Sequence, residues 1–175
     1  EKGKGLDIYS ELLERRPEDP MAHSYFASYL IRNERTAEAV THLAGVIEAE
    51  YGTPGLREQL IRIHIQQKNL ATARAAFVQM ADAYPEDPLT QRAEARIARA
   101  ERRPERAAEI LRTLIATSEN FETLRMLAFS EFTLGNLPAA TSAIDRSLAL
   151  SGSFSADAAR LKARIHHDAK DWVLA

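Results

Sequence analysis

One pattern constrains the fold of this chain more than any other: the sequence repeats its markers every 34 residues. Pairs made of a capping residue and a proline recur at this spacing: Asp19-Pro20, Thr53-Pro54 and Asp87-Pro88. In each pair we expect the first side chain to accept a free backbone N–H at the start of a helix. Proline suits the first helical position because no intrahelical donor is needed there. The pairs therefore predict three helix starts, one period apart.

Small residues and polar turns keep the same period. The small residues recur at intervals of 34, 34, 34 and 33 residues: Gly5, Ala39, Ala73, Ala107 and Ala140. A polar turn precedes each of the last four: Asn33-Glu34-Arg35, Lys68-Asn69-Leu70, Arg102-Arg103-Pro104 and Gly135-Asn136-Leu137. Three independent markers with one period predict a unit of two helices joined by a turn. Small residues let the two helices approach closely, and larger apolar residues then pack on the next pair.

The period and its markers resemble the tetratricopeptide repeat family over essentially the whole chain. In the first full repeat the family pattern falls on His23, Phe26, Ala27, Leu30, Ala39, Leu43 and Val46. The resemblance implies an all-α fold, a right-handed α-solenoid of antiparallel helix pairs with about ten helices. It implies one array, 1–175, with these parts: a half-repeat at 4–17, repeats at 20–51, 54–85, 88–119 and 121–152, and a half-repeat at 155–175. Half-repeats at both ends predict a fragment of a longer chain with a tendency to associate end to end.

Some residues depart from the family pattern. Glu94 and Glu131 stand where the family places apolar residues, and the first helix of the third repeat is the least regular. Near the end of the chain, residues 155–167 predict a helix, and Lys170-Asp171-Trp172 predicts the next turn.

The composition narrows the classes of function. The chain has no Cys, which excludes disulfides and thiolate metal sites and leaves the compartment open. A formal net charge of −2 gives no general attraction to nucleic acid or to anionic membranes, and no apolar run reaches the roughly 20 residues of a membrane span. The sequence contains no Gly-rich phosphate loop, no Gly-x-Ser-x-Gly and no His-Glu-x-x-His. It therefore predicts no enzyme, no cofactor, no metal site and no nucleic acid partner.

In tetratricopeptide arrays the first helices line a concave groove that holds the ligand. The resemblance places these candidate binding residues there: Arg62, Arg92, Arg96, Arg99, Arg125, Phe129 and Phe132. Arg92, Arg96 and Arg99 are spaced i, i+4 and i+7, so they share one helix face. The planar guanidinium suits carboxylates, and the two phenylalanines would add an apolar anchor. We therefore predict a protein–protein interaction scaffold whose groove binds an acidic peptide or protein segment.

Other interpretations of the same residues remain open. The arginines are also typical of a solvated face paired with Glu94, Glu101 and Glu105. The following helix could cover Phe129 and Phe132. The alternative functions are a structural spacer or self-associating module, and a regulatory arm of a larger enzyme or membrane-anchored assembly protein.

Overall fold

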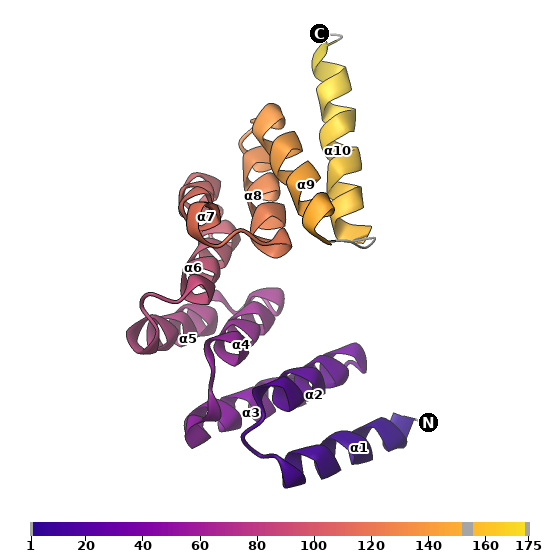
Figure 1. Cartoon of the computed structure of the whole chain (residues 1–175), viewed down its shortest axis with the longest axis vertical. Coiled ribbons are helices and arrows are strands. Elements are labelled where there is room, and N and C mark those ends of the chain that lie inside the picture. The colour runs from indigo at the N-terminus through magenta and orange to yellow at the C-terminus, as the bar shows by residue number, and fades with distance from the viewer. Residues whose placement is uncertain (1, 152–155, 174–175) are drawn as a thin grey trace. The chain divides into compact units, whose positions relative to one another are not determined.

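The described part of the chain is helical from end to end. This computed structural model describes the backbone of residues 2–151 and 156–173, and the side-chain surroundings of residues 7–150 and 156–168. Within those ranges no strand occurs, and the α-helices (Figure 1) are α1 (Lys2–Arg15), α2 (Pro20–Arg32), α3 (Thr36–Val46), α4 (Pro54–Gln66), α5 (Leu70–Ala83), α6 (Pro88–Ala100), α7 (Pro104–Thr117), α8 (Phe121–Thr133), α9 (Leu137–Ser151) and α10 (Ala156–Val173). A π-helical turn, Ile47–Tyr51, extends α3.

The capping pairs start helices as predicted, with one correction. Asp19 Oδ1 accepts a hydrogen bond from the Met21 amide at 2.9 Å, and Asp87 Oδ1 accepts one from the Leu89 amide at 2.7 Å. Thr53 makes no such bond, so the prediction of a side-chain cap was wrong there. At that point Arg57 Nε donates to the Gly52 carbonyl at 3.1 Å and ties the first turn of α4 to the preceding segment.

The turn inside each helix pair has the same backbone geometry in all four repeats. One residue per turn adopts a positive φ: Glu34 (62°), Lys68 (61°), Arg102 (60°) and Gly135 (75°). The amide of this residue and the amide of the next residue donate hydrogen bonds to carbonyls in the last turns of the first helix. In the second repeat, for example, Lys68 N donates to the Ile65 carbonyl and Asn69 N to the His64 carbonyl, at 3.0 and 2.9 Å. These bonds satisfy helix-end carbonyls, but only glycine adopts the conformation without a steric cost.

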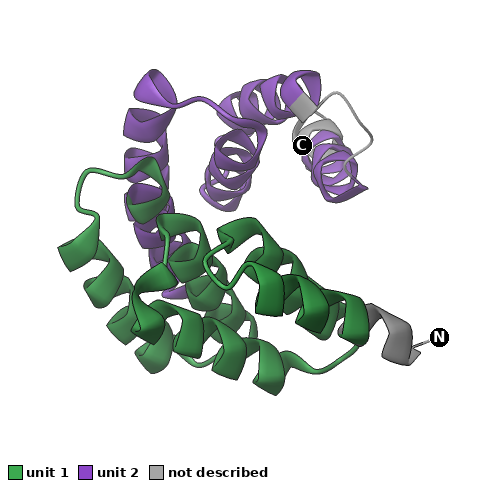
Figure 2. Cartoon of the chain, turned by 60° about the horizontal axis from the view of Figure 1, so that its bottom comes forward, with its two compact units in different colours: residues 1–90 green, residues 91–175 purple. Residues whose placement is uncertain are grey.

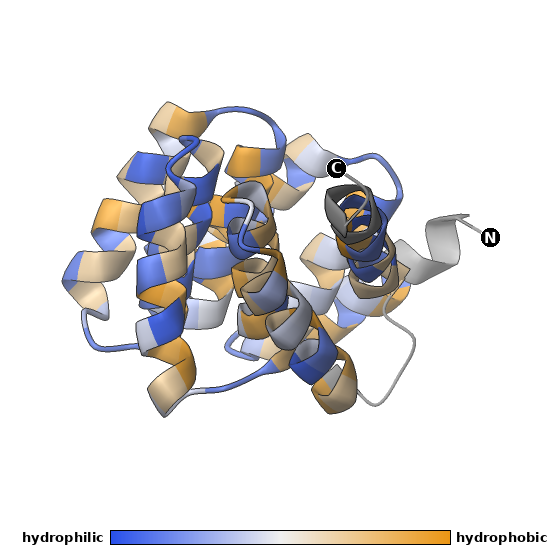
Figure 3. Ribbon diagram, turned by 90° about the horizontal axis from the view of Figure 1, so that it is seen from above, coloured by the Kyte–Doolittle hydropathy of each residue, from blue (hydrophilic) through white to orange (hydrophobic). Residues whose placement is uncertain are grey.

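The helices group into two compact units, residues 1–90 and 91–175, and the division falls inside α6 (Figure 2). The prediction of one array contained no such division. Polar and apolar residues alternate along the helices (Figure 3), as expected when each helix buries only one stripe. No helix in the described ranges combines the length and the hydropathy needed to cross a bilayer.

The core of unit 1 is built from α2, α3 and α4. Its buried apolar residues are Ala27, Leu30, Ala39, Leu43, Val46, Leu56, Leu60 and Ile63. Ala27 and Ala39 are fully buried, as predicted for small residues at the crossing of a helix pair. The Tyr9 ring lies 5.7 Å from the Phe26 ring and 5.4 Å from the Tyr29 ring, and so attaches α1 to α2.

A pair of histidines links α2 to α3 in unit 1. His23 Nδ1 lies 3.0 Å from His42 Nε2, and His23 Nε2 lies 2.7 Å from the Pro17 carbonyl. The carbonyl can only accept, so His23 Nε2 carries a hydrogen, and in the neutral pair His42 Nε2 donates to His23 Nδ1. Burial, followed by the influence of His23, lowers the pKa of His42 to about 4. His42 is therefore uncharged at neutral pH.

The connection from α3 to α4 is held by hydrogen bonds to Gly52. Besides Arg57, the Tyr84 hydroxyl donates to the Gly52 carbonyl, at 3.0 Å. A Cβ on Gly52 would lie 2.9 Å from the Ile47 Cα, so the close passage of the chain over the π-helical turn requires glycine.

The core of unit 2 is richer in alanine. Its buried residues are Ala95, Ala108, Ile110, Leu111, Met126, Leu127, Ala128, Ala140, Ala143, Ile144, Ala158, Leu161 and Ile165. Ala95 and Ala98 are buried on the inner face of α6, so this helix packs into the unit although few of its residues are large and apolar. At the C-terminal end, α10 continues through residues 170–172, so the turn predicted there was wrong. Ala175 lies outside the described residues.

Two ion pairs explain the carboxylates at apolar positions of the family pattern. Glu131 is 1% exposed; it accepts from Arg112 Nε at 2.9 Å and from Asn136 Nδ2 at 3.0 Å. Glu94 is half-buried and pairs with Arg106 at 2.9 Å. Each carboxylate therefore links a first helix to a second helix by charge where the family usually uses apolar contact.

Candidate functional site

The predicted arginine face of α6 lies against α8 within unit 2. On α8, Glu122, Arg125 and Phe129 follow one another at i, i+3 and i+7, so they share a face as the α6 arginines do. Arg96 Nη2 lies 3.2 Å from Glu122 Oε1. The Arg99 guanidinium lies over the Phe129 ring, 4.3 Å from its centroid. These two contacts bring the two helix faces together.

One carboxylate, Glu122, pairs with two arginines at this place. Arg125 holds Glu122 through both oxygens, with Nε at 3.1 Å from Oε2 and Nη2 at 2.9 Å from Oε1. Although burial raises the pKa of Glu122, Arg125 and Arg96 bring it below its usual value. Glu122 is thus ionised at neutral pH. We call Arg96, Arg99, Glu122 and Arg125 the arginine cluster, and it carries three positive charges against one negative charge.

The structure shows these arginines and carboxylates in ion pairs, as the pairing alternative supposed in kind. Glu94 pairs with Arg106, and Glu101 pairs with Arg103 at 3.3 Å. A carboxylate that the pairing alternative did not include, Glu122, reaches Arg96 of α6.

Arg99 is the least compensated member of the arginine cluster. Burial, followed by the positive charges of Arg96 and Arg125, lowers the pKa of Arg99 to about 10, so the side chain remains charged at neutral pH. It makes no ion pair with a carboxylate of the described residues, and its buried Nε has no hydrogen-bond partner among them. Its one specific contact within the described ranges is the Phe129 ring, and a cation over an aromatic face is a moderate attraction.

A cavity of about 260 Å³ adjoins Arg99 and Phe129. We call it the Phe129 cavity, and its lining residues are Arg99, Arg102, Pro104, Phe129, Ser130 and Thr133. Ser130 Oγ donates to the Met126 carbonyl at 3.0 Å, and Thr133 Oγ1 donates to the Phe129 carbonyl at 2.8 Å. Because both hydroxyl hydrogens are used within α8, the strong donors left in the lining are the guanidinium groups of Arg99 and Arg102.

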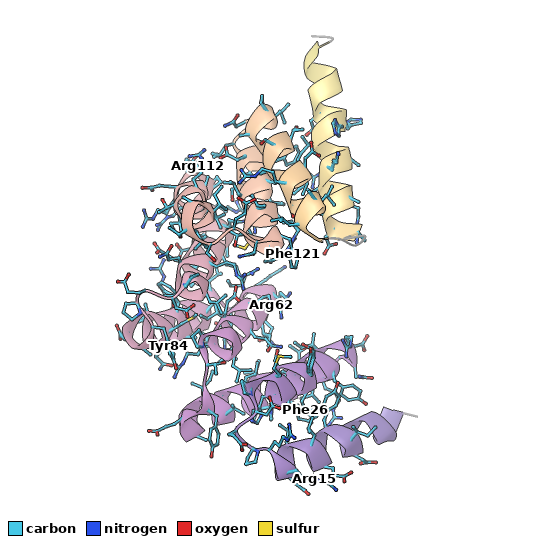
Figure 4. The ribbon with its side chains drawn as sticks, viewed as in Figure 1. Arg15, Phe26, Arg62, Tyr84, Arg112 and Phe121 are labelled. Atoms are coloured by element: carbon cyan, nitrogen blue, oxygen red, sulfur yellow. The ribbon has the colours of Figure 1, made fainter. Side chains whose placement is uncertain are left out.

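The other predicted site residues are placed differently. Phe129 is 39% exposed, whereas Phe132 packs against the core of unit 2 and lies under Arg164 of α10, at 5.2 Å from guanidinium to ring centroid. The two phenylalanines therefore do not form one anchor. Arg92 is half-buried on α6. Arg62 belongs to α4 of unit 1 (Figure 4). Both Arg62 and Arg92 have interaction partners of their own.

Sequence reasoning missed Arg102 and Pro104 in the cavity lining and Arg164 over Phe132. Arg102 could have been found, because it follows Arg99 by three residues and occupies the repeated turn position. Nothing in the local sequence places Arg164 on Phe132, since the contact joins two helices of different repeats.

The family model of the tetratricopeptide repeat matches residues 26–88 and 58–120, together more than half of the chain. The chain belongs to the tetratricopeptide repeat family. The all-α repeat fold predicted from the sequence is thereby confirmed, as are the helix pairs of that family's solenoids. Tetratricopeptide repeats generally serve as protein–protein interaction scaffolds, and this coarse function applies to the chain. Proteins of the family are generally non-enzymatic.

Solved structures agree with the assignment. The chain is similar to one described as the crystal structure of the APC/C hetero-tetramer Cut9–Hcn1, with a TM-score of 0.78 and 18% identity over 97% of this chain and 34% of that chain. A thermophilic tetratricopeptide protein from Thermus thermophilus gives a TM-score of 0.76 at 15% identity, over 94% of this chain and 90% of that one. PilF of Pseudomonas aeruginosa gives 0.65 at 14% identity, over 97% and 78%. At these identities the likeness shows the fold alone. The chain spans about a third of the first of these proteins, and no curated protein sequence matches it.

Proposed function

We propose that the tetratricopeptide array binds an acidic segment of a protein partner at the arginine cluster of unit 2. The observation that carries the proposal is the excess of positive charge at this place. Glu122 pairs with Arg96 and Arg125, while the neighbouring Arg99, also half-buried, has no ion pair within the described residues. A carboxylate from a partner would supply the missing acceptor, and charge-assisted bonds to arginine are among the stronger hydrogen bonds.

The distribution of charge over the chain supports the same partner chemistry. Residues 91–175 hold thirteen Lys and Arg and eleven Asp and Glu, a formal charge of +2, while residues 1–90 hold ten and fourteen, a formal charge of −4. The positive potential is therefore local to unit 2, where it attracts acidic segments and disfavours basic ones.

A binding measurement with defined peptides tests the proposal. Fluorescently labelled peptides of equal length, one rich in Asp and Glu and one rich in Lys and Arg, are titrated with the whole chain at low and moderate salt. We expect the acidic peptide to bind more tightly, with an affinity that falls as salt rises because part of the attraction is screened. Equal affinity for both peptides would contradict the proposal.

Paired variants assign the binding to its residues. Arg99→Gln removes the uncompensated charge of the arginine cluster and should weaken acidic-peptide binding about tenfold, as expected for a lost charge-assisted bond. Arg160→Gln is the matched control, since Arg160 is an exposed arginine of unit 2 that pairs with Asp157 on α10. The same loss in both variants would show that only net charge matters and that the site lies elsewhere.

A further inference from the structure

The Phe129 cavity is a second feature of unit 2, separate from the ion pairs of the arginine cluster. At about 260 Å³ it is smaller than the roughly 300–1,000 Å³ of most small-molecule sites and large enough for one large side chain. Its wall is the ring of Phe129, Pro104 and the aliphatic parts of Ser130 and Thr133. The size and the apolar wall suit a single leucine, methionine or aromatic side chain.

The charged groups in the lining of the Phe129 cavity indicate which residue of the partner lies next to that side chain. Arg99 and Arg102 both contribute to the lining, and neither makes an ion pair within the described residues. The hydroxyls of Ser130 and Thr133 already donate to their own helix, so the lining favours an apolar group rather than a polar one that needs donors of its own. A ligand that complements two guanidinium groups beside an apolar cavity has a hydrogen-bond acceptor next to an apolar group.

We infer that the Phe129 cavity takes one large apolar side chain of the partner, and that an acidic residue next to it in the partner's sequence is held by Arg99 and Arg102. The inference rests on the proposed function and narrows it. The partner segment is then not merely acidic; it carries a large apolar residue adjacent to an aspartate or glutamate. The occupant is a protein segment, because the cavity accommodates one side chain and the neighbouring arginine cluster extends the complementary charge beyond it.

Substitution of Arg102 separates two effects, because its backbone conformation lowers the stability of the fold while its side chain contributes to the proposed binding site. The residue adopts a φ of 60°, a conformation in which glycine is preferred, and Lys68 adopts the same conformation one repeat earlier, with a φ of 61°. Arg102→Gly should therefore raise the melting temperature by a few degrees while it removes a guanidinium from the Phe129 cavity. Lys68→Gly is the matched control, with the same relief of the backbone and no change at the cavity.

The experiment compares two acidic peptides that differ at one central position, leucine in one and alanine in the other, on the whole chain and three variants. We expect the leucine peptide to bind the unmodified chain about tenfold more tightly, as burial of one large side chain allows. Arg102→Gly should weaken the binding of both peptides about threefold to tenfold although it melts higher. Lys68→Gly should melt higher and bind both peptides as the unmodified chain does.

Thr133→Trp completes the set, because Thr133 is an exposed residue of the lining and the larger side chain fills the Phe129 cavity without altering any charge. This variant should bind the two peptides equally, at the affinity of the alanine peptide.

The outcomes separate the two proposals. If the unmodified chain binds both peptides equally well, the inference about the cavity is wrong and the acidic-segment function stands. If it binds neither, both are wrong. A leucine preference that survives in Thr133→Trp would place the apolar contact elsewhere and overturn the inference. A dimer in sedimentation that Thr133→Trp converts to monomer would show that a second copy of this chain fills the cavity, and would overturn it as well.

Discussion

The two units share one repeat geometry but are linked internally by different chemistry. In unit 1 the polar links described above run to acceptors that are not carboxylates: the His23–His42 pair, and the bonds from Arg57 and the Tyr84 hydroxyl to the Gly52 carbonyl. In unit 2 the links described above are ion pairs, as in the burial of Glu131 against Arg112 and the sharing of Glu122 by two arginines. The helix pairs of both units have the same turn, with one residue of positive φ per repeat. The repeat thus determines where helices lie, and the side chains at equivalent positions are free to differ in chemistry.

The largest effect is expected where unit 2 depends on a buried charge. Arg112→Leu would leave the carboxylate of Glu131, which is 1% exposed, with Asn136 as its remaining bond, and should lower the free energy of unfolding by about 2–4 kcal/mol. Denaturant unfolding of the whole chain measures this loss. Arg106→Leu is the control, because its partner Glu94 has a side chain that is 38% exposed, and it should cost at most about 1 kcal/mol. Equal costs would mean that burial of Glu131 has no energetic consequence.

A steric effect of somewhat smaller size is expected in unit 1. Gly52→Ala would place a Cβ 2.9 Å from the backbone of Ile47, which cannot move aside as a flexible side chain would, and should cost about 1–3 kcal/mol. Gly45→Ala, in the last turn of α3 and continued by the π-helical turn, with nothing within 4 Å, should instead stabilise by about 0.5–1 kcal/mol. Thermal melting of the two variants gives the comparison. Similar shifts in both would contradict the close passage of the chain at Gly52.

The pH dependence should differ between the units. The pKa of His42 is lowered to about 4 in the folded chain, against about 6.5 when it is unfolded, so the unfolded state binds the proton first. Stability is therefore full above about pH 6.5 and falls as the pH drops toward 4. Because His42 is partly exposed, solvent screening limits the loss to about 1–2 kcal/mol.

Hydrogen exchange of the whole chain between pH 7 and pH 4.5 tests this point, once corrected for the intrinsic effect of pH on exchange. Amides of α2 and α3 should lose protection more than amides of α8 and α9. His42→Gln should remove the difference, while His166→Gln, at an exposed position of α10, should leave it unchanged. A difference that persists in His42→Gln would assign the effect to another group.

The smallest effects concern the repeated turn, and here we expect the units to behave alike. Glu34→Gly in unit 1 should stabilise by about 0.5–1 kcal/mol, since its φ is 62°. Gly135→Ala in unit 2, at a φ of 75°, should destabilise by about 1 kcal/mol. Differential scanning calorimetry can resolve both shifts. Effects of the same sign would show that the turn geometry does not control these residues.

How far the sequence predicted this molecule depends on the range of the interactions involved. Helix starts at Pro20, Pro54 and Pro88 follow from local rules, and the structure has them at those residues. The positive φ of Arg102 was not predicted. The sequence offers one indication of it: glycine, Gly135, stands at the equivalent turn position of the next repeat. The buried Glu131 looked like a defect in the pattern, since its partner Arg112 belongs to the preceding helix pair.

The candidate site shows the same limit. Spacing along one helix correctly grouped Arg92, Arg96 and Arg99 on a face of α6, because that relation is local. It did not reveal that Phe129 faces Arg99 while Phe132 faces Arg164, since each contact joins different helices. The choice of Glu122 as the shared carboxylate likewise depends on how α6 lies on α8.

Glu122 has a kinetic consequence. Because it is tethered on the same helix as Arg125 and bonded to both Arg125 and Arg96, it is always present at a high effective concentration beside them. It holds these two guanidinium groups in place before any partner arrives, and it reoccupies them when a partner carboxylate leaves. If an acidic partner binds at this face as proposed, any of its carboxylates that bonds Arg96 or Arg125 would do so by exchange with Glu122, which would shorten the lifetime of each complex.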